Sequence, residues 1–92
     1  MIQLRVAVTS AVGLHARPAA VFVGEAGRFA SKIRVRNVTR NSPWVDAKSI
    51  LSVLTLGVEQ HHEIEIQADG PDEAPAAAEL QKLIASDFAG KL

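Results

Sequence analysis

Residues 2–23 of the chain read IQLRVAVTSAVGLHARPAAVFV, and within this stretch the spacing of the apolar side chains changes. Residues 2–9 alternate between apolar and other side chains, which is the two-residue period of a half-buried strand. After a turn over residues 11–14, apolar positions recur every three or four residues from residue 16 to about residue 27, as in an amphipathic helix. The fold is therefore expected to begin with a strand, a turn and a helix.

The rest of the chain continues this mixture of strands and helices. Predicted strands cover residues 32–38, 44–45 and 62–67, and predicted helices cover residues 47–56 and the stretch from residue 71 or 75 to residue 88. Two starts remain open for the last helix because Pro75 lacks the amide that should bond one turn back if the helix begins at residue 71.

This order of elements predicts the α+β class. Alternation in the strands leaves one face of the sheet polar, and the helices need an apolar face to cover. We therefore expect an open-faced β-sandwich (βαββαβα), in which a four-stranded antiparallel sheet has three helices on one face.

The composition limits the classes of partner. The chain has 92 residues, of which 48% are hydrophobic and 22% charged, so it is expected to fold as a single domain over residues 1–92. Its ten basic and ten acidic residues balance, without the basic clustering of a nucleic-acid-binding protein. Cysteine is absent, and no apolar run approaches the about 20 residues of a membrane span. We expect a cytoplasmic protein without a nucleic-acid or membrane partner.

The segment GLHARPAA, residues 13–20, lies where the first strand gives way to the first helix. The first amides of a helix, here those of Ala16 and Arg17, lack intrahelical partners and favour a bound phosphate. His15 can accept a phosphoryl group as a neutral nucleophile, and Arg17 can offer its planar guanidinium to phosphate oxygens. Pro18 suits the first helical turn, where its missing N–H is not needed. The alternative is that His15 only caps the helix and Arg17 is a solvated charge, but the coincidence of these residue types at one helix start favours a phosphorylation site.

The helix expected over residues 47–56 has more apolar side chains than one buried face can hold. Val53 and Leu56 are a candidate inward-facing pair. The remaining apolar side chains then form an exposed patch of the kind that binds other proteins: Ile50, Leu51 and Leu54. The alternative is that the last helix covers this one and buries both of its sides.

Ser49 is expected to be the N-cap of the same helix in the unmodified protein. A phosphate on Ser49 would be favourable at the helix start, yet it would add negative charge beside the patch and oppose docking of an acidic or apolar partner. His61 and His62 could suggest a metal site, but neighbouring residues that enter a strand point to opposite faces of the sheet. No third potential ligand follows at a spacing typical of a metal site, so both are interpreted as turn and surface residues. No metal or other cofactor is expected.

In the two segments just described, the sequence resembles the histidine-containing phosphocarrier family HPr of the bacterial phosphoenolpyruvate-dependent sugar phosphotransferase system. The resemblance rests on GLHARPA at residues 13–19, AKSI at residues 47–50 and LGV at residues 56–58. It implies that Nδ1 of His15, assisted by Arg17, accepts phosphate from Enzyme I and passes it to sugar-specific Enzyme IIA proteins.

The resemblance also implies a fold and further partners. The family fold is the open-faced βαββαβα sandwich, and a monomer is expected. In some bacteria a kinase phosphorylates the serine that matches Ser49, which weakens the carrier activity and creates a form that binds a transcriptional regulator. The face that matches Ile50, Leu51 and Leu54 docks partners. A carrier of this kind is phosphorylated transiently and is not an enzyme with its own turnover.

Other hypotheses remain open. A nitrogen-related or purely regulatory member of the same family would use the same site and differ only in its partners. A protein-interaction module would bind through residues 49–56, with His15 as a structural cap. An independent enzyme is the least favoured class, because the sequence has no glycine-rich nucleotide loop and no set of metal ligands.

Overall fold

The computed structural model describes residues 1–89, and within them the elements follow the predicted order. The strands are β1 (Ile2–Ala7), β2 (Lys32–Asn37), β3 (Val45–Asp46) and β4 (Glu63–Asp69). The helices are α1 (Ala16–Ala26), α2 (Ile50–Thr55) and α3 (Glu73–Ala85). The α+β prediction and the βαββαβα order are confirmed.

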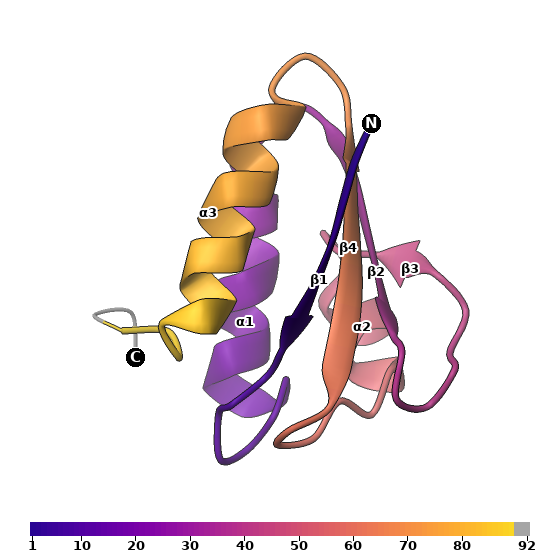
Figure 1. The fold of residues 1–92 in the computed structure, drawn as a ribbon, viewed down its shortest axis with the longest axis vertical. Coiled ribbons are helices and arrows are strands. Elements are labelled where there is room, and N and C mark those ends of the chain that lie inside the picture. The colour runs from indigo at the N-terminus through magenta and orange to yellow at the C-terminus, as the bar shows by residue number, and fades with distance from the viewer. Residues whose placement is uncertain (90–92) are drawn as a thin grey trace.

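The strands form one antiparallel sheet in the order β1-β4-β2-β3 (Figure 1). β4 is central, and its Ile66 lies opposite Leu4 of β1 and Val35 of β2. Because β1 and β4 are antiparallel neighbours, the loop after β1 and the turn before β4 meet at the same end of the sheet. That end also holds the start of α1.

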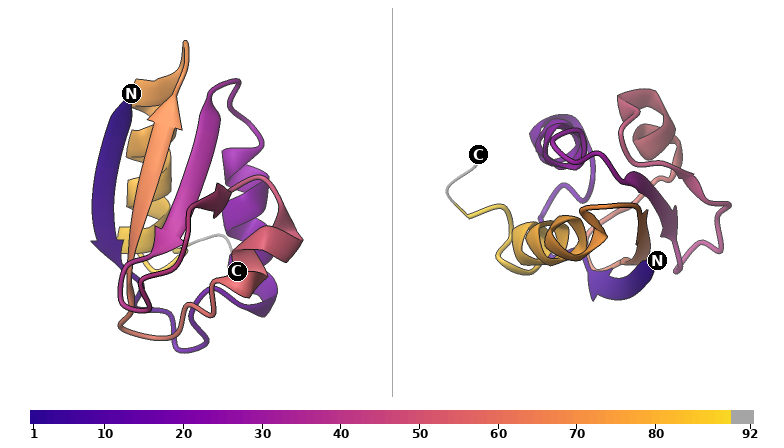
Figure 2. Two further views of the ribbon diagram at one scale, coloured as in Figure 1. Left: turned by 90° about the vertical axis from the view of Figure 1, so that its right-hand side faces the viewer. Right: turned by 90° about the horizontal axis from the view of Figure 1, so that it is seen from above.

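All three helices lie on one side of the sheet, as the view from above in Figure 2 shows. The space between the layers is filled by apolar side chains that are almost completely removed from water, and this burial is the main favourable term in folding. The largest of them are Phe22, Phe88, Leu14, Ile33, Ile64, Ile66, Leu80 and Ile84. The predicted open-faced sandwich is therefore confirmed.

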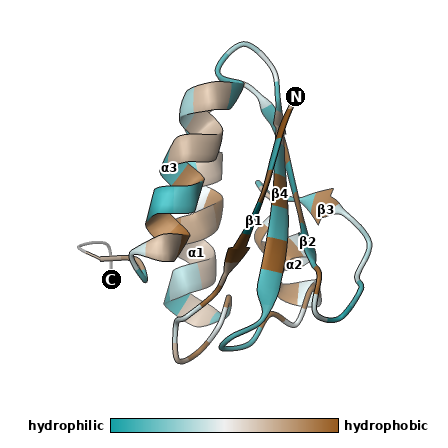
Figure 3. Ribbon diagram, in the orientation of Figure 1, coloured by the Kyte–Doolittle hydropathy of each residue, from teal (hydrophilic) through white to brown (hydrophobic). Residues whose placement is uncertain are grey.

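The opposite face of the sheet is polar, and the alternation along β4 is visible in Figure 3. Glu65 lies on this face, but it is only 9% exposed because arginines cover it. The guanidinium of Arg36 lies 2.6 Å from the carboxylate and that of Arg5 lies 3.6 Å away. The hydrogen bond from Arg36 is the main cause that lowers the pKa of Glu65 below its ordinary value. Two basic strand residues are thus used within the fold.

The second helix starts later than residue 47. The side chain of Asp46 accepts the amide N–H of Lys48 at 2.9 Å, and its carbonyl accepts that of Ser49 at 3.2 Å. These bonds form a turn that occupies the residues before the helix. α2 therefore begins only at Ile50.

Of the two starts left open for the last helix, residue 71 is too early, and the helix begins later, towards residue 75. α3 begins at Glu73, so Pro75 falls in its first turn, where an amide has no helical acceptor. The predicted end is also too late, because Asp87 and Phe88 have positive φ values and follow the helix. Phe88 nevertheless packs into the core at 1% exposure.

Candidate functional site

His15 is the N-cap residue of α1. Its backbone is extended, with φ −125° and ψ 166°, and its side chain makes no capping hydrogen bond. The imidazole is half-buried. His15 therefore occupies the capping position, but its ring makes no hydrogen bond to the helix and is left for other chemistry.

The loop before His15 is fixed to the segment that precedes β4. The amide of Leu14 donates to the carbonyl of Val58 at 3.0 Å, and Leu14 itself is fully buried. Gly13 has a φ of 66°, and a Cβ at this position would lie 2.1 Å from the same carbonyl oxygen. Only glycine allows the two backbones to approach so closely. His15 is thus held on a rigid support.

The first turn of α1 presents two amides beside His15. The first helical hydrogen bond runs from the amide of Ala19 to the carbonyl of His15, at 3.5 Å. The N–H groups of Ala16 and Arg17 precede this bond and have no acceptor within the helix, while Pro18 is buried in the same turn and has no N–H. Ala16 adopts a φ of 51°, a left-handed conformation that few non-glycine residues take. The arrangement suits an anion at the end of the helix.

A depression of about 370 Å³ lies beside the histidine, lined by Ala11, Val12, His15, Glu59 and Gln60. Glu59 and Gln60 were not predicted as neighbours of His15. They reach it because β1 pairs with β4, a long-range contact without a local signature in the sequence. Arg17 is exposed and does not line this depression. Its contact with a phosphate stays a prediction.

His62 helps to hold the turn that contains Glu59. Its Nδ1 accepts the amide N–H of Glu59 at 3.1 Å and lies 3.2 Å from the side-chain nitrogen of Asn37. His61, in contrast, is exposed and has a φ of 73°. The two histidines occupy different environments at this turn.

Ser49 is the N-cap of α2, as predicted. Its backbone is extended, and its hydroxyl oxygen accepts the amide N–H of Ser52 at 3.3 Å. The side chain is half-buried. Unlike His15, Ser49 therefore contributes its side chain to the helix that it precedes.

The apolar side chains of α2 divide as predicted. Val53 and Leu56 are buried, with 0% and 3% exposure. Leu51 is 75% exposed, and its neighbours Ile50 and Leu54 are 38% and 37% exposed. The alternative in which α3 covers α2 is wrong. These three residues, here called the α2 patch, form an exposed apolar surface on an element that contacts α1.

Comparisons with known proteins agree with this geometry. A family model described as "PTS HPr component phosphorylation site" matches residues 2–86. The chain is 38% identical over 88 residues to the phosphocarrier protein HPr of Treponema pallidum, which covers 96% of this chain and 97% of that protein. The crystal structure of HPr-C-His from Thermoanaerobacter tengcongensis superposes with a TM-score of 0.91 at 39% identity, over 100% of both chains.

A longer relative is also similar. The multiphosphoryl transfer protein of Vibrio cholerae is 48% identical over 71 residues, which is 77% of this chain but only 17% of that protein. The chain thus spans a small part of that relative and nearly all of the Treponema protein.

Proposed function

Because the chain belongs to the HPr family of phosphotransferase-system phosphocarriers, we propose that His15 accepts phosphate from Enzyme I and passes it to Enzyme IIA proteins. The observation that supports this most directly is the position of the His15 ring. It makes no capping bond, and the two residues that follow His15 carry amides that precede the first helical hydrogen bond. A nucleophile and an anion-binding helix end are thus next to each other.

The proposed chemistry uses the lone pair of Nδ1 of His15. A bond forms from this nitrogen to phosphorus while the bond from phosphorus to the donor breaks, and the reverse exchange passes the group to the acceptor. The amides of Ala16 and Arg17 would hold phosphate oxygens, and the guanidinium of Arg17 would offset their charge. Pro18 fixes the turn. The histidine returns unchanged, so the protein is a carrier without its own turnover.

The α2 patch is the proposed docking surface for both Enzyme I and Enzyme IIA. Leu51 is largely exposed, although burying a leucine stabilises by about 1.5–3 kcal/mol. A partner that covered the patch would gain this energy. The contact between α2 and α1 supports docking next to the His15 site.

A second proposal concerns regulation at Ser49. The hydroxyl of Ser49 lies at the start of α2, next to the α2 patch. Phosphorylation by a serine kinase would add a charge of about −1.5 to −2 at this place, oppose docking and create a form that a transcriptional regulator could bind. Phosphocarrier transfer would then be slowed without any change at His15.

The remaining proposals follow from the family. Residues 1–92 act as a single, monomeric and cytoplasmic phosphocarrier domain that needs neither cofactor nor nucleic acid. Among the helices of residues 1–89, none could span a membrane. A nitrogen-related or regulatory role would use the same His15 site with other acceptors, whereas a protein-interaction module would use the α2 patch without phosphoryl transfer.

The test is the intact mass of the protein after incubation with phosphoenolpyruvate and Enzyme I from the same source. We expect one added phosphate that brief acid treatment removes and that His15→Ala abolishes. His61→Ala is the matched control, because His61 is an exposed histidine outside the depression beside His15, and it should be phosphorylated normally. Phosphate on the His15→Ala protein would contradict the proposal, and no phosphate on the unaltered protein would favour the interaction module.

A further inference from the structure

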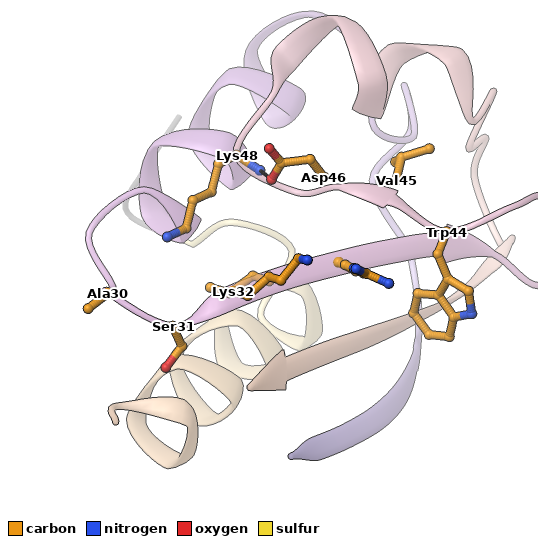
Figure 4. Close-up of a pocket in the computed structure, with 9 residues that line it drawn as sticks. Ala30, Ser31, Lys32, Trp44, Val45, Asp46 and Lys48 are labelled. Atoms are coloured by element: carbon orange, nitrogen blue, oxygen red, sulfur yellow. Dashed lines mark hydrogen bonds between the residues drawn. The ribbon is translucent and has the colours of Figure 1, made fainter. Parts of the chain in front are cut away.

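A second depression lies at the edge of the sheet, where β3 pairs with only part of β2. The two strands are in register at two positions only, Val45 with Val35 and Asp46 with Arg34. Beside the first half of β2, the short partner leaves a depression of about 410 Å³, lined by residues 30–34, 44–46 and Lys48 (Figure 4). It shares no residue with the depression beside His15. We call it the edge site.

Basic side chains that form no ion pair within residues 1–89 cluster at the edge site. Three of them line it: Lys32, Arg34 and Lys48. Within residues 1–89, none of the three forms an ion pair, whereas Arg5 and Arg36 on the same sheet both pair with Glu65. The ammonium group of Lys48 donates to the carbonyl of Phe29 at 2.6 Å, which leaves its charge uncompensated.

One acidic group, Asp46, also lines the edge site. Its carboxylate accepts the backbone amide N–H of Lys48 at 2.9 Å, so one of its oxygens is used in the turn before α2. A second acidic group, Asp69, lies opposite Lys32 in the sheet and lines an adjoining depression with Lys32 and Arg34. The three basic groups still exceed these two negative charges. The edge site therefore favours an anion.

Trp44 forms one end of the edge site, opposite Lys48 in the view of Figure 4. It is the only tryptophan in the chain and is half-buried. The guanidinium carbon of Arg36 lies 5.5 Å from the centroid of its ring, a cation–π contact that holds the indole in place. A fixed aromatic ring beside lysine and arginine provides a stacking surface next to phosphate-binding groups.

We propose that the edge site binds a small phosphorylated ligand with an aromatic ring, which in chemical class is a nucleotide. Its phosphates contact Lys32 and Arg34, Lys48 adds positive charge, and its base packs against Trp44. The volume of about 410 Å³ lies within the range of about 300–1,000 Å³ typical of small-molecule sites. Binding is non-covalent and leaves the His15 site unoccupied, so it does not depend on the phosphocarrier function.

The test is a titration of the ¹⁵N-labelled protein with ATP, monitored by the Trp44 indole resonance, by backbone amides and by tryptophan fluorescence. We expect saturable changes confined to β2, β3 and Trp44. The double variant Lys32→Gln, Arg34→Gln should bind at least about tenfold more weakly, because hydrogen bonds between charged partners are lost. Lys48 is left unaltered since its ammonium group also holds Phe29.

Two comparisons sharpen this test. Lys82→Gln is the matched control, because Lys82 is an exposed lysine on α3 away from the edge site, and it should change the affinity by less than about twofold. Trp44→Leu should weaken ATP binding about tenfold and leave the binding of inorganic tripolyphosphate unchanged. Shifts that do not saturate, an equal loss in Lys82→Gln, or equal affinity for tripolyphosphate and ATP would overturn the proposal.

Discussion

α1 and α2 each follow an N-cap residue that could take a phosphoryl group, but the two helices use its side chain differently. The His15 ring makes no capping bond, whereas the Ser49 hydroxyl accepts the amide N–H of Ser52. Phosphorylation of His15 therefore removes no capping contact from α1. A phosphate on Ser49 would be attached to the oxygen that already accepts the amide N–H of Ser52. The proposed loading of His15 thus leaves the hydrogen bonds at the start of α1 unchanged, whereas a phosphate on Ser49 would alter those at the start of α2.

The largest effect is expected from disturbing the support of His15. In Gly13→Ala, the new Cβ would meet the carbonyl oxygen of Val58, and alanine would have to adopt a φ of 66°. The chain must shift, so we expect the free energy of unfolding to fall by about 3 kcal/mol and phosphoryl transfer to slow as well. Denaturant unfolding followed by circular dichroism measures the first effect.

Gly24→Ala is the control for this variant. Gly24 lies in α1, and a Cβ there would meet nothing within 4 Å. This variant should gain about 0.5–1 kcal/mol of stability and keep its transfer rate, because alanine is the better helix former. A similar loss of stability in both glycine variants would show that the approach to Val58 is not the cause.

The next largest effects come from a comparison of the buried side of α2 with its exposed side. Val53→Ala removes buried methyl groups and should lower the free energy of unfolding by about 2 kcal/mol, whereas Leu51→Ala should leave it within about 0.5 kcal/mol. Leu51→Ala should instead slow phosphoryl transfer from Enzyme I by about tenfold, because the exposed leucine belongs to the proposed docking surface. The rate is measured with purified Enzyme I by quenching the transfer reaction at set times and determining the phosphorylated fraction of the protein. An unchanged rate in Leu51→Ala would remove the α2 patch from the transfer step.

A smaller effect tests the contrast between the helix starts directly. Ser49→Ala removes the cap of α2 and should cost about 1 kcal/mol of stability, while Ser49→Asp keeps an acceptor and should cost less. His15→Ala should change stability by less than about 0.5 kcal/mol, because no capping bond is lost. Thermal unfolding of the three variants checks the order. A cost at His15 equal to that at Ser49 would remove the distinction drawn between the two sites.

The features that were predicted correctly from the sequence depend on neighbouring residues. The start of α1, the N-cap Ser49 and the inward side of α2 all follow from spacing within a few positions. The start of α2 was placed too early because helical spacing does not reveal the turn that Asp46 forms with Lys48. Local periodicity identifies an element more reliably than it fixes the ends of the element.

The features that were missed depend on distant parts of the chain. Glu59 lines the depression beside His15 only because β4 pairs with β1. Trp44 and Lys32 line the same depression only because the third strand has two residues and leaves the first half of β2 uncovered. Neither arrangement can be predicted from the local sequence, because each depends on how strands that are distant in the chain pair in the sheet.

The smallest effect concerns the start of α3, which uses its N-cap residue in a third way. The carboxylate of Asp72 bonds to another segment, accepting the amide N–H groups of Ala30 at 2.9 Å and Ser31 at 2.8 Å and the Ser31 hydroxyl. The bond from the Ser31 hydroxyl is the main cause that lowers the pKa of Asp72 below its ordinary value of 3.8.

This lowered pKa gives stability a dependence on pH. Because the folded protein holds Asp72 ionised more strongly than the unfolded chain does, the contribution is complete above a pH of about 5 and is lost as the pH falls through the folded pKa. Asp72→Asn keeps the shape of the side chain and removes the charge. The difference in Tm between the unaltered protein and Asp72→Asn should therefore be constant near neutral pH and shrink below a pH of about 4, measured by thermal unfolding in a pH series. A difference that stays the same into acid would mean that Asp72 holds Ser31 through shape and not through charge, and the third helix start would then resemble that of α2.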